Sequence, residues 1–344
     1  MKFKLKSIAA TFGLVGLVTS NLVMAEESEG ITGVTLSGGV QVEAQYNRDY
    51  NEVETSDFVV DEMTLGIEAQ VHPYAKAQIT FLYEEGATPL EADEAYLTLG
   101  NEELSPIYLS VGQLYVPFGN FESHMVSDPL TLELAETREK AVQLGIDAGG
   151  FYGSVYLFNG DNQDDSEDKI DHYGANLGFA NETDSISYDV GVDYINDIGD
   201  TGGLSWLLEE VDDYDYVDGL GAHIVLNFGV VSLMGEYITA LDEFKANQIA
   251  FNEQAAQPKA WNAEAGLTFD IAGKETTFAV GYQMTEEALA LELPETRILG
   301  VISTAINDNT TVSLEYAVDE DYSENDGGTG QDAKSAILQL AVQF

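Results

Sequence analysis

The amino-acid sequence predicts an all-β fold: a transmembrane, antiparallel, up-and-down β-barrel of about 16 strands. Three observations lead to this prediction. Apolar and polar residues alternate in 16 separate segments, the connections between these segments are alternately short and long, and the last segment keeps alternating up to the final residue. A period of two marks a strand with one apolar and one polar face. Connections of alternating length are typical of barrels in bacterial outer membranes.

The first 25 residues have the three parts of a secretory signal peptide. A basic start with Lys2, Lys4 and Lys6 precedes an apolar stretch at residues 8–18, and small residues lie near Ala25. The apolar stretch is too short to cross a bilayer comfortably, which disfavours the alternative of a permanent anchor. We therefore expect residues 1–25 to be removed and residues 26–344 to form a single barrel domain.

The strands are predicted in order from the alternation. In residues 34–46 every even position is apolar or glycine, and residues 63–71 repeat the pattern. The other strands of the first half are predicted at residues 75–84, 93–99, 107–115, 141–148, 151–158 and 173–179. Those of the second half are predicted at residues 186–194, 220–228, 231–237, 261–269, 276–284, 296–306, 311–316 and 336–344. Within residues 296–306 the sequence is compatible with either face pointing inward.

The connections divide into two kinds. Short turns are predicted at residues 72–74, 149–150, 229–230 and 307–310, and long polar connections at residues 47–57, 159–171, 195–219, 238–260 and 317–334. In an up-and-down barrel all connections of one kind lie at the same end. We expect the long ones outside the cell.

The alternating strands also indicate the environment. A helix that spans a bilayer needs roughly 20 consecutive apolar residues, which no segment after the leader approaches, and the mean hydropathy is −0.09. Strands with one apolar face can lie in lipid when a closed sheet pairs all backbone groups, and the polar face then lines the lumen. A soluble β-sandwich or β-helix is the alternative, but it does not require connections of alternating length. Tyr46, Tyr115 and Phe228 lie near predicted strand ends, as in interfacial aromatic girdles.

The last strand ends in an alternating pattern with Leu338, Leu340, Val342 and Phe344 on one face. This pattern resembles the terminal signal that the barrel-assembly machinery recognises. We therefore expect the protein in the outer membrane of a Gram-negative bacterium, in contact with lipid and lipopolysaccharide.

Composition excludes several classes of function. The 61 acidic and 13 basic residues give a net charge of −48, which repels phosphate and makes nucleic acid a poor partner. The chain has no cysteine, which excludes a disulfide scaffold. The four histidines belong to no HExxH motif and to no serine–histidine pattern of the barrel phospholipases, so we expect no enzymatic activity. No cofactor or protein-bound metal is expected, although the acid-rich segments 161–168, 212–218 and 319–326 could attract divalent cations that bridge to lipopolysaccharide.

The connection at residues 117–140 has an unusual mixture of charges. It contains Glu122, His124, Asp128, Glu133, Glu136, Arg138, Glu139 and Lys140. In sixteen-strand porins the third loop folds into the lumen and sets its width, and charges at the narrowest point determine ion selectivity. We predict that these residues form a pore constriction; the alternative is a solvated outer loop.

This region also carries a family resemblance. The segment GQLYVPFGNFESHMVSDPLTLELAETRE, residues 112–139, resembles the LbtU family of siderophore porins, and DEAYLTLGN at residues 93–101 fits as well. The resemblance extends over most of the chain after the leader. It implies an outer-membrane barrel that imports a small iron chelate, a ferric siderophore, without the plug domain of energised receptors.

Strand parity predicts which side chains line the lumen. The predicted lumen-facing residues are Glu43, Glu62, Glu68, Lys76, Glu94, Asp147, Asp189, Asp193, His223, Glu236 and Glu264. Because acids dominate this set, the wall should favour cations. Glycines such as Gly145, Gly174 and Gly178 are predicted to face inward and to leave space, so we expect an open lumen.

Three functions remain open at this point. The protein could be a passive porin for a siderophore or another specific solute, a general cation-preferring porin, or an adhesin whose lumen is filled. The adhesin predicts exposed apolar patches on the loops, for which GLSWLL at residues 203–208 is the candidate. The sequence does not identify the solute, and it is compatible with a monomer or a homotrimer.

Overall fold

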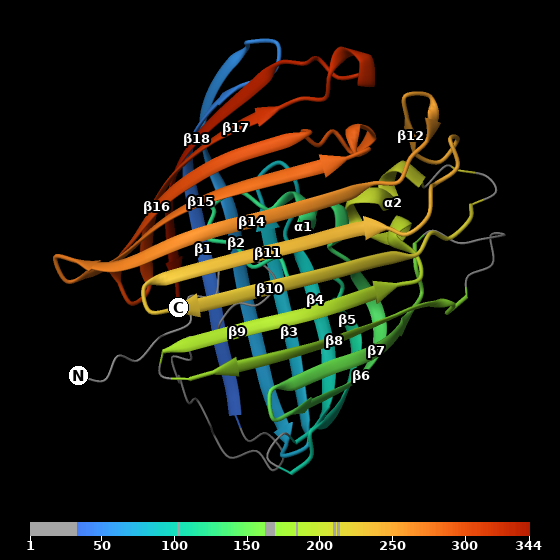
Figure 1. The fold of residues 1–344 in the computed structure, drawn as a ribbon. Helices are drawn as coiled ribbons and strands as arrows, with labels where there is room; N and C mark the ends of the chain where they lie inside the picture. Colours follow the sequence, from blue (N-terminus) through green and yellow to red (C-terminus); the bar gives the residue numbers. More distant parts are fainter. Residues whose placement is uncertain (1–32, 102–103, 162–168, 184, 209–210, 212–213) are drawn as a thin grey trace.

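The computed structural model describes residues 33–344 except 102–103, 162–168, 184, 209–210 and 212–213. In this part of the chain, sixteen long antiparallel strands form one closed barrel, in which β1 pairs with β18 (Figure 1). The predicted fold class and number of strands are confirmed. The predicted signal peptide, residues 1–25, lies outside the described residues.

The strands cover most of the ranges predicted for them. The first half contains β1 Gly33–Arg48, β2 Glu54–His72, β3 Ala75–Glu84, β4 Glu91–Gly100, β5 Ile107–Tyr115, β6 Arg138–Ala148, β7 Phe151–Phe158, β8 His172–Glu182 and β9 Ile186–Ile195. The second half contains β10 Gly219–Phe228, β11 Val231–Ala240, β14 Lys259–Ile271, β15 Lys274–Glu286, β16 Thr296–Asn307, β17 Thr310–Glu320 and β18 Asp332–Gln343.

Short elements occur in the long connections. The strands β12 Ala250–Phe251 and β13 Gln254–Ala255 form a hairpin between β11 and β14, and the helices are α1 Leu130–Ala135 and α2 Gly202–Leu208. Single 3-10 turns lie at Ile198–Asp200, Leu289–Leu291 and Glu324–Asp326. Among the described residues, no helix has the length and apolar character needed to span a membrane.

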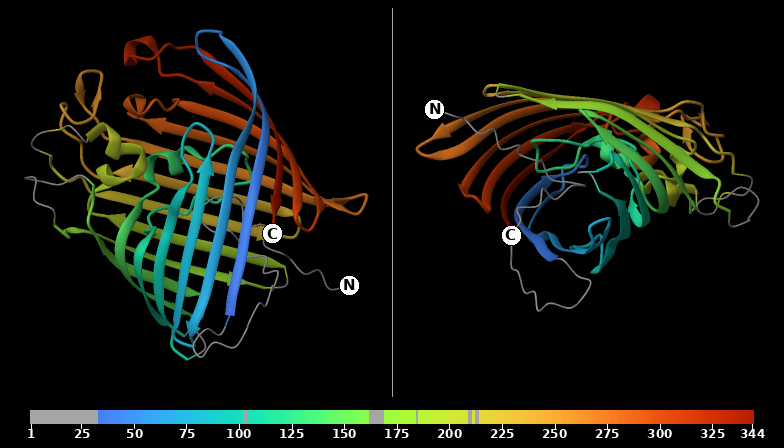
Figure 2. Two further views of the ribbon diagram at one scale, coloured as in Figure 1. Left: turned by 180° about the vertical axis from the view of Figure 1, so that it is seen from behind. Right: turned by 90° about the horizontal axis from the view of Figure 1, so that it is seen from below.

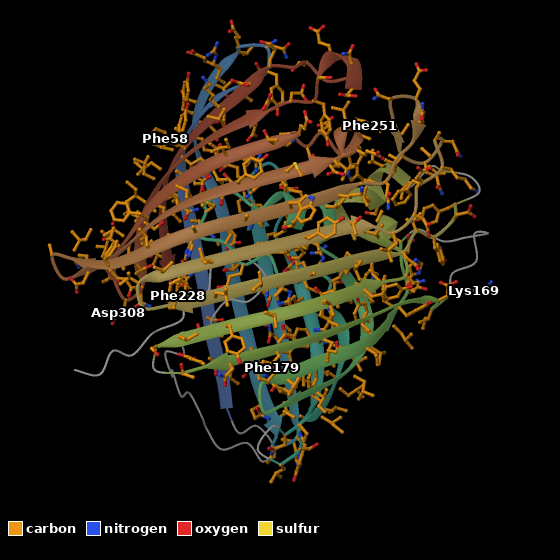
Figure 3. The ribbon with its side chains drawn as sticks, viewed as in Figure 1. Phe58, Lys169, Phe179, Phe228, Phe251 and Asp308 are labelled. Atoms are coloured by element: carbon orange, nitrogen blue, oxygen red, sulfur yellow. The ribbon has the colours of Figure 1, made fainter. Side chains whose placement is uncertain are left out.

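The apolar residues of the alternating sequence point to the outer face of the barrel, and the polar residues between them point inward. Outward side chains such as Leu97, Leu177 and Val280 are more than half exposed, which in a protein surrounded by water would be costly. Aromatic side chains lie near both ends of the strands: Phe151 contacts Phe179 at the end with the short turns, and Tyr237 stacks with Trp261 at the other end. Figure 3 shows Phe179 and Phe228 on the outside of the ribbon. This arrangement matches a lipid-facing band with interfacial girdles.

The barrel closes through the last residues of the chain. β18 pairs with β1 from Gly39–Gln343 to Arg48–Lys334, and the backbone of Phe344 makes two further hydrogen bonds with Gly38, at 2.9 and 3.0 Å. The side chains of Leu338, Leu340, Val342 and Phe344 point outward and are 38 to 50% exposed. Closure leaves no unpaired edge strand, which is the condition for a sheet in lipid.

Two predictions about the strands need correction. The connection predicted at residues 47–57 is shorter, because Glu54 and Thr55 pair with Arg48 and Asn47 and extend β2 toward this end. The connection predicted at residues 117–140 ends earlier, because β6 begins at Arg138, which pairs with Tyr115. In β16, whose facing the sequence left open, Leu299 and Val301 point inward and are nearly buried.

The strands are strongly tilted relative to the barrel axis. The two ends of the barrel differ in the length of their connections. Seen from below, the strands form a ring (Figure 2, right). One end, the turn end, has tight connections such as those between β6 and β7 and between β10 and β11. The other end, the loop end, has the long connections with α2 and the β12–β13 hairpin, and α1 lies inside the barrel behind β11 and β14 (Figure 1).

Candidate functional site

The connection between β5 and β6, residues 116–137, folds into the barrel, and we call it the inner loop. It has an apolar core of its own, because Phe118 and Leu134 are essentially fully buried and pack with residues of the β9–β10 connection such as Ile198 and Leu204. Burying such side chains stabilises the inward conformation by roughly 1.5–3 kcal/mol each. The sequence predicted this placement of the loop.

Three carboxylates of the barrel wall hold the inner loop by its backbone. Glu236 on β11 accepts hydrogen bonds from the backbone N–H groups of Asn120 (2.6 Å) and Phe121 (3.3 Å) and from the Thr131 hydroxyl (2.6 Å). A loop inside a barrel has few backbone partners of its own, and each unpaired buried N–H is costly. The carboxylate supplies acceptors where a neighbouring strand is absent.

The other two carboxylates repeat the arrangement further along the loop. Glu264 on β14 accepts from the Ser123 hydroxyl (2.6 Å) and the His124 backbone (2.8 Å). Glu315 on β17 accepts from the Val126 backbone (2.5 Å) and the Ser127 hydroxyl (2.5 Å). We call Glu236, Glu264 and Glu315 the acid anchors; all three are buried. They fix the inner loop against the wall formed by β11, β14 and β17.

The β9–β10 connection holds the inner loop from the loop end. The Thr201 hydroxyl donates to the Leu134 carbonyl at 2.8 Å, and the Gly202 backbone donates to the Glu136 carbonyl at 2.8 Å. At Gly203 the two helices approach so closely that a Cβ atom would lie 1.7 Å from the Glu133 carbonyl oxygen. This contact of α1 with α2 requires glycine.

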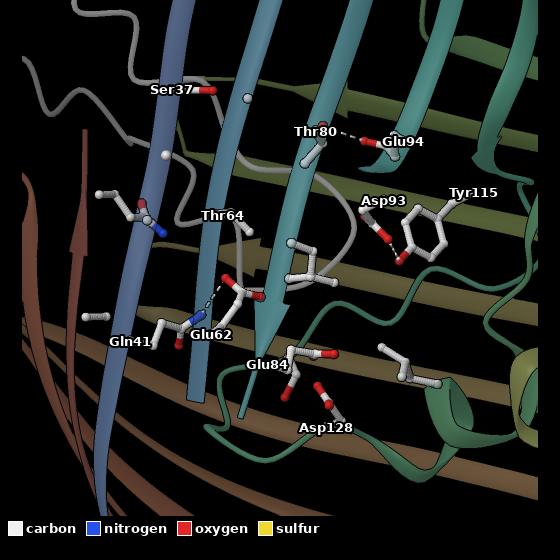
Figure 4. A pocket seen from close by; sticks show the side chains of 18 of the residues that line it. Ser37, Gln41, Glu62, Thr64, Thr80, Glu84, Asp93, Glu94, Tyr115 and Asp128 are labelled. Carbon is white, nitrogen blue, oxygen red and sulfur yellow. Dashed lines mark hydrogen bonds between the residues drawn. The ribbon is translucent and has the colours of Figure 1, made fainter. Parts of the chain in front are cut away.

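A large cavity remains on the opposite side of the inner loop, and we call it the passage. It has a volume of about 1570 Å³. Its lining includes Asp161 and Asp200 at the loop end and Asp270, Lys274 and Asp308 at the turn end. Between these ends the passage runs along β1 to β6, part of which Figure 4 shows, and its lining also includes residues of β15 to β18 such as Thr277, Ser313 and Gln339. The inward faces of β7 to β11 do not line it. The inner loop therefore reduces the lumen to a channel on the side opposite β7 to β11.

The lining of the passage is strongly acidic. It includes 15 acidic residues but only three basic ones, Lys76, Arg138 and Lys274. Lys76 pairs with Glu68 at 3.2 Å, and Arg138 pairs with Asp93 at 2.6 Å and with Glu91 at 2.8 Å, so two of the bases are already neutralised. Acids that surround a passage with low-dielectric walls create a negative potential, and this potential attracts cations.

The inner loop brings further acids to the passage. Asp128 points toward Glu84 of β3 (Figure 4), and its Oδ1 is buried without a hydrogen-bond partner. Burial, followed by the charges of Glu133, Glu136, Asp61 and Glu84, raises the pKa of Asp128 well above its usual value. A cation that enters the passage beside these carboxyls favours their ionised form and is bound by it.

The loop residues predicted for the constriction take different places. Asp128, Glu136, Arg138, Glu139 and His124 line the passage, and Glu133 lies exposed near its mouth. His124 also contacts Ser232 through Nε2, so it attaches the loop to β11, and burial lowers its pKa. Glu122 lies on the far side of the loop, toward Asp189, and burial together with that charge raises its pKa.

Three of these residues belong to a strand and not to the loop. Arg138, Glu139 and Lys140 form the start of β6 and pair with residues of β5. Glu139 points inward, whereas Lys140 is exposed and lies outside the lining of the passage. The prediction that Lys140 belongs to the constriction is therefore corrected, because Lys140 shares the outer face of β6 with the exposed Val142 and Leu144.

The predicted wall residues also divide into groups. Those that line the passage are Glu62, Glu68, Lys76, Glu94 and Asp147. Glu43 points inward but is covered, because Gln45 and Gln339 each donate to it at 2.8 Å. The other residues, which are Asp189, Asp193, His223, Glu236 and Glu264, lie outside the lining of the passage, on strands β9, β10, β11 and β14.

The sequence predicted that all these residues line one open lumen, and the structure corrects this prediction. The inner loop covers Glu236 and Glu264, whose charges hold its backbone and do not face the passage. Behind the loop, Tyr152 donates to Asp189 at 2.7 Å and lies 3.1 Å from His223 Nε2. Alternation along a strand correctly predicts which side chains point inward, but it cannot show which of them another part of the chain covers.

The inward glycines need a similar correction. Gly145, Gly174 and Gly178 were expected to leave open space, yet the rings of Tyr108, Tyr156 and Tyr152 lie where their Cβ atoms would be. The glycines therefore allow tyrosine rings to lie against the wall. The open part of the lumen is the passage, on the side that the inner loop does not fill.

Several site residues had no clear signal in the sequence. Ser123, Ser127 and Thr131 bind the acid anchors, and Gln283 accepts from the Leu130 backbone at 3.2 Å. The spacing of these three hydroxyl residues, four positions apart in the loop sequence, was the available hint. In the described part of the chain, no cluster of three or more acidic or histidine side chains has the geometry of a metal site.

Comparison with known proteins places these features in context. No protein-family model matches the sequence. A UPF0422 protein of Legionella pneumophila strain Philadelphia 1 is 29% identical over 355 residues, which cover 90% of this chain and 66% of that protein. A UPF0422 protein of Coxiella burnetii is 27% identical over 308 residues, with 86% and 66% covered. The chain thus spans about two thirds of the length of these curated relatives.

Solved structures show the same architecture. The outer-membrane channel DcaP of Acinetobacter baumannii superimposes with a TM-score of 0.62 at 14% identity, over 93% of this chain and 99% of that one. An anion-selective porin from Comamonas acidovorans gives 0.62 at 13% identity, over 91% and 99%. OmpF of Salmonella typhi gives 0.60 at 13% identity, over 91% and 98%. The chain therefore has the fold of the outer-membrane porins.

Proposed function

We propose that the protein is a channel of the Gram-negative outer membrane through which small solutes pass passively, with a preference for cations. One observation carries the proposal: an acidic passage extends from the loop end of the barrel to the turn end, beside an inner loop held by buried acid anchors. In outer-membrane barrels the long loops face outward. Solutes would therefore enter at the loop end.

The charge of the passage determines the expected selectivity. The acids of its lining outnumber the bases fifteen to three, so a cation entering the passage is stabilised and an anion is repelled. Salt screens charges over about 10 Å at 0.1 M. The preference for cations should therefore be strongest at low ionic strength.

A ferric siderophore is the specific solute that we propose. The support is the resemblance of residues 112–139 to siderophore porins, because these residues build the end of β5, the inner loop and the start of β6. The acidic passage adds a restriction: an iron chelate of neutral or positive charge fits it better than an anionic ferric carboxylate.

The same proposal includes the surroundings of the barrel. We propose export by the signal peptide, insertion by the barrel-assembly machinery through the β18 pattern, and contact with lipid and lipopolysaccharide. Divalent cations could bridge acids of the outer loops to lipopolysaccharide phosphates. Both a monomer and a homotrimer are compatible with this arrangement.

Single-channel recording in a planar bilayer tests the proposal. With a potassium chloride gradient across the bilayer, we expect open channels whose reversal potential has the sign of a cation-selective pore. Ferric siderophores of positive, neutral and negative charge are then added. Block by the positive or neutral chelate supports siderophore passage, whereas no effect of any chelate supports a general cation-preferring porin. Anion selectivity, or no conductance, would contradict the proposed channel, and no conductance would favour the adhesin.

A further inference from the structure

A second cavity lies at the loop end, beside the entrance of the passage. It has a volume of about 470 Å³ and is formed by four connections: those after β3, β5, β9 and β15. Thr88, Leu132, Glu136 and Gly202 line both this cavity and the passage. The cavity therefore opens into the passage, and we call it the mouth pocket.

One side of the mouth pocket is apolar. Its lining includes Trp206 of α2, Leu132 of α1, and Leu291 and Leu293 of the β15–β16 connection. Trp206 is 51% exposed, and its indole N–H donates to the Gly203 carbonyl at 2.9 Å, which orients the ring. An exposed tryptophan beside a pocket is a common feature of binding sites, because its large face contacts apolar groups and cations alike.

The other side of the mouth pocket is acidic. Glu133 and Glu136 line it, and none of its lining residues is basic. Glu136 follows the last residue of α1, and the Gly202 backbone donates to its carbonyl, which fixes the position of Glu136 at the pocket. An anionic ligand would be repelled by this side, and a neutral apolar ligand would gain nothing from it.

We propose that the mouth pocket binds an organic cation with an apolar body, such as a substituted ammonium compound, before it enters the passage. The apolar body contacts Trp206 and the leucines, and the positive group lies against Glu133 and Glu136. The inference rests on the proposed function in that the pocket is the entrance of the proposed channel.

Fluorescence of Trp206 offers a direct test. The chain has two tryptophans, and the other, Trp261, stacks on Tyr237 at the outer face. A Trp261→Phe variant in detergent micelles therefore leaves Trp206 as the reporter. The probe is benzyltrimethylammonium, which combines an aromatic body with a permanent positive charge. We expect saturable quenching or a spectral shift of Trp206 emission by this probe.

Matched probes and variants separate the two sides of the pocket. Tetramethylammonium, which lacks the apolar body, should bind at least about fivefold more weakly, and benzylsulfonate should not compete. Glu136→Gln should weaken binding of benzyltrimethylammonium about fivefold, a typical loss for one ion pair. Glu243→Gln removes an equally negative side chain from an exposed loop position outside the pocket, and should change the affinity less than twofold.

The pH dependence provides a second readout. Burial, followed by the charges of Asp93, Glu84 and Glu133, raises the pKa of Glu136 to about 7, although Arg138 opposes this. Glu136 is thus largely neutral at pH 6 and largely ionised at pH 8, while the probe keeps its charge. Affinity should therefore rise severalfold from pH 6 to pH 8 in the parent protein. The rise should be clearly smaller in Glu136→Gln.

The outcomes distinguish this inference from the proposed channel. If the protein conducts cations but Trp206 emission does not respond to the probe, the inference is overturned and the channel stands. Equal binding of benzylsulfonate, or equal loss in Glu136→Gln and Glu243→Gln, would also overturn it. If the probe binds as expected but no conductance is seen, the pocket stands and the proposed channel fails.

Discussion

At the scale of single residues, burial separates the acids of the barrel into two kinds. Asp128 and Glu84 face the passage, whereas the acid anchors are covered by the loop that they hold. A carboxylate that accepts several N–H and O–H bonds can stay buried, because those donors replace its water. The negative charge of this chain therefore has structural as well as electrostatic roles.

Glu264 tests the structural role. In Glu264→Ala, the His124 backbone N–H and the Ser123 hydroxyl lose their acceptor, at a cost of about 1–3 kcal/mol for each group left buried and unpaired. We expect the inner loop to become mobile and single-channel recordings to show larger and noisier currents.

Two comparisons make that result specific. Glu264→Gln keeps one acceptor oxygen and should give an intermediate effect. Glu182→Ala removes an exposed acid at the turn end of β8 and should leave the recordings unchanged. Quiet currents of parental size in Glu264→Ala would show that the acid anchors do not hold the loop.

At the scale of elements, strands and connections differ in how far the sequence determines them. The strands could be predicted closely, because lipid outside and water inside impose a period of two that is visible residue by residue. The fold of the inner loop depends on partners more than 100 positions away, such as Glu236 with Asn120. No local pattern reveals such pairs, so its inward position was predicted but its attachment was not.

The same reasoning explains which site predictions needed correction. Lys140 was placed at the end of the connection predicted at residues 117–140, although its backbone pairs with Gln113 of β5. Gly145 was expected to leave space, but Tyr108 from the neighbouring strand occupies that space. In both cases the deciding contact comes from a different element.

The contact of α1 with α2 can be tested through two adjacent glycines. In Gly203→Ala the new Cβ atom would lie 1.7 Å from the Glu133 carbonyl oxygen, so the helices must separate; in Gly202→Ala the nearest atom, the Glu136 carbonyl oxygen, is 3.5 Å away. We expect Gly203→Ala to expose the β9–β10 connection to added protease in the folded barrel, and Gly202→Ala to resist like the parent. Equal resistance of both variants would mean that α2 does not depend on this close contact.

At the scale of the whole molecule, stability depends on closure. A barrel in lipid pairs every strand with two neighbours, and the β1–β18 pairing links residues almost 300 positions apart. Such distant pairing forms slowly, because the loop-closure entropy is lost before the contacts form. The end of the chain therefore influences assembly more strongly than its small size suggests.

Phe344 is the residue on which this argument can be tested. Its backbone exchanges two hydrogen bonds with Gly38, and its ring lies beside that glycine on the outer face. Deletion of Phe344 should lower the yield of folded barrel several-fold, measured as the fraction whose gel mobility in detergent changes on heating. Phe228→Ala removes a similarly exposed outer phenylalanine at the turn end, 45% exposed against 50%, but leaves the closing pairs intact, and should retain most of the yield. If the two variants lost folded protein equally, the effect would come from lost lipid contact, and the special contribution of the closing residues would be disproved.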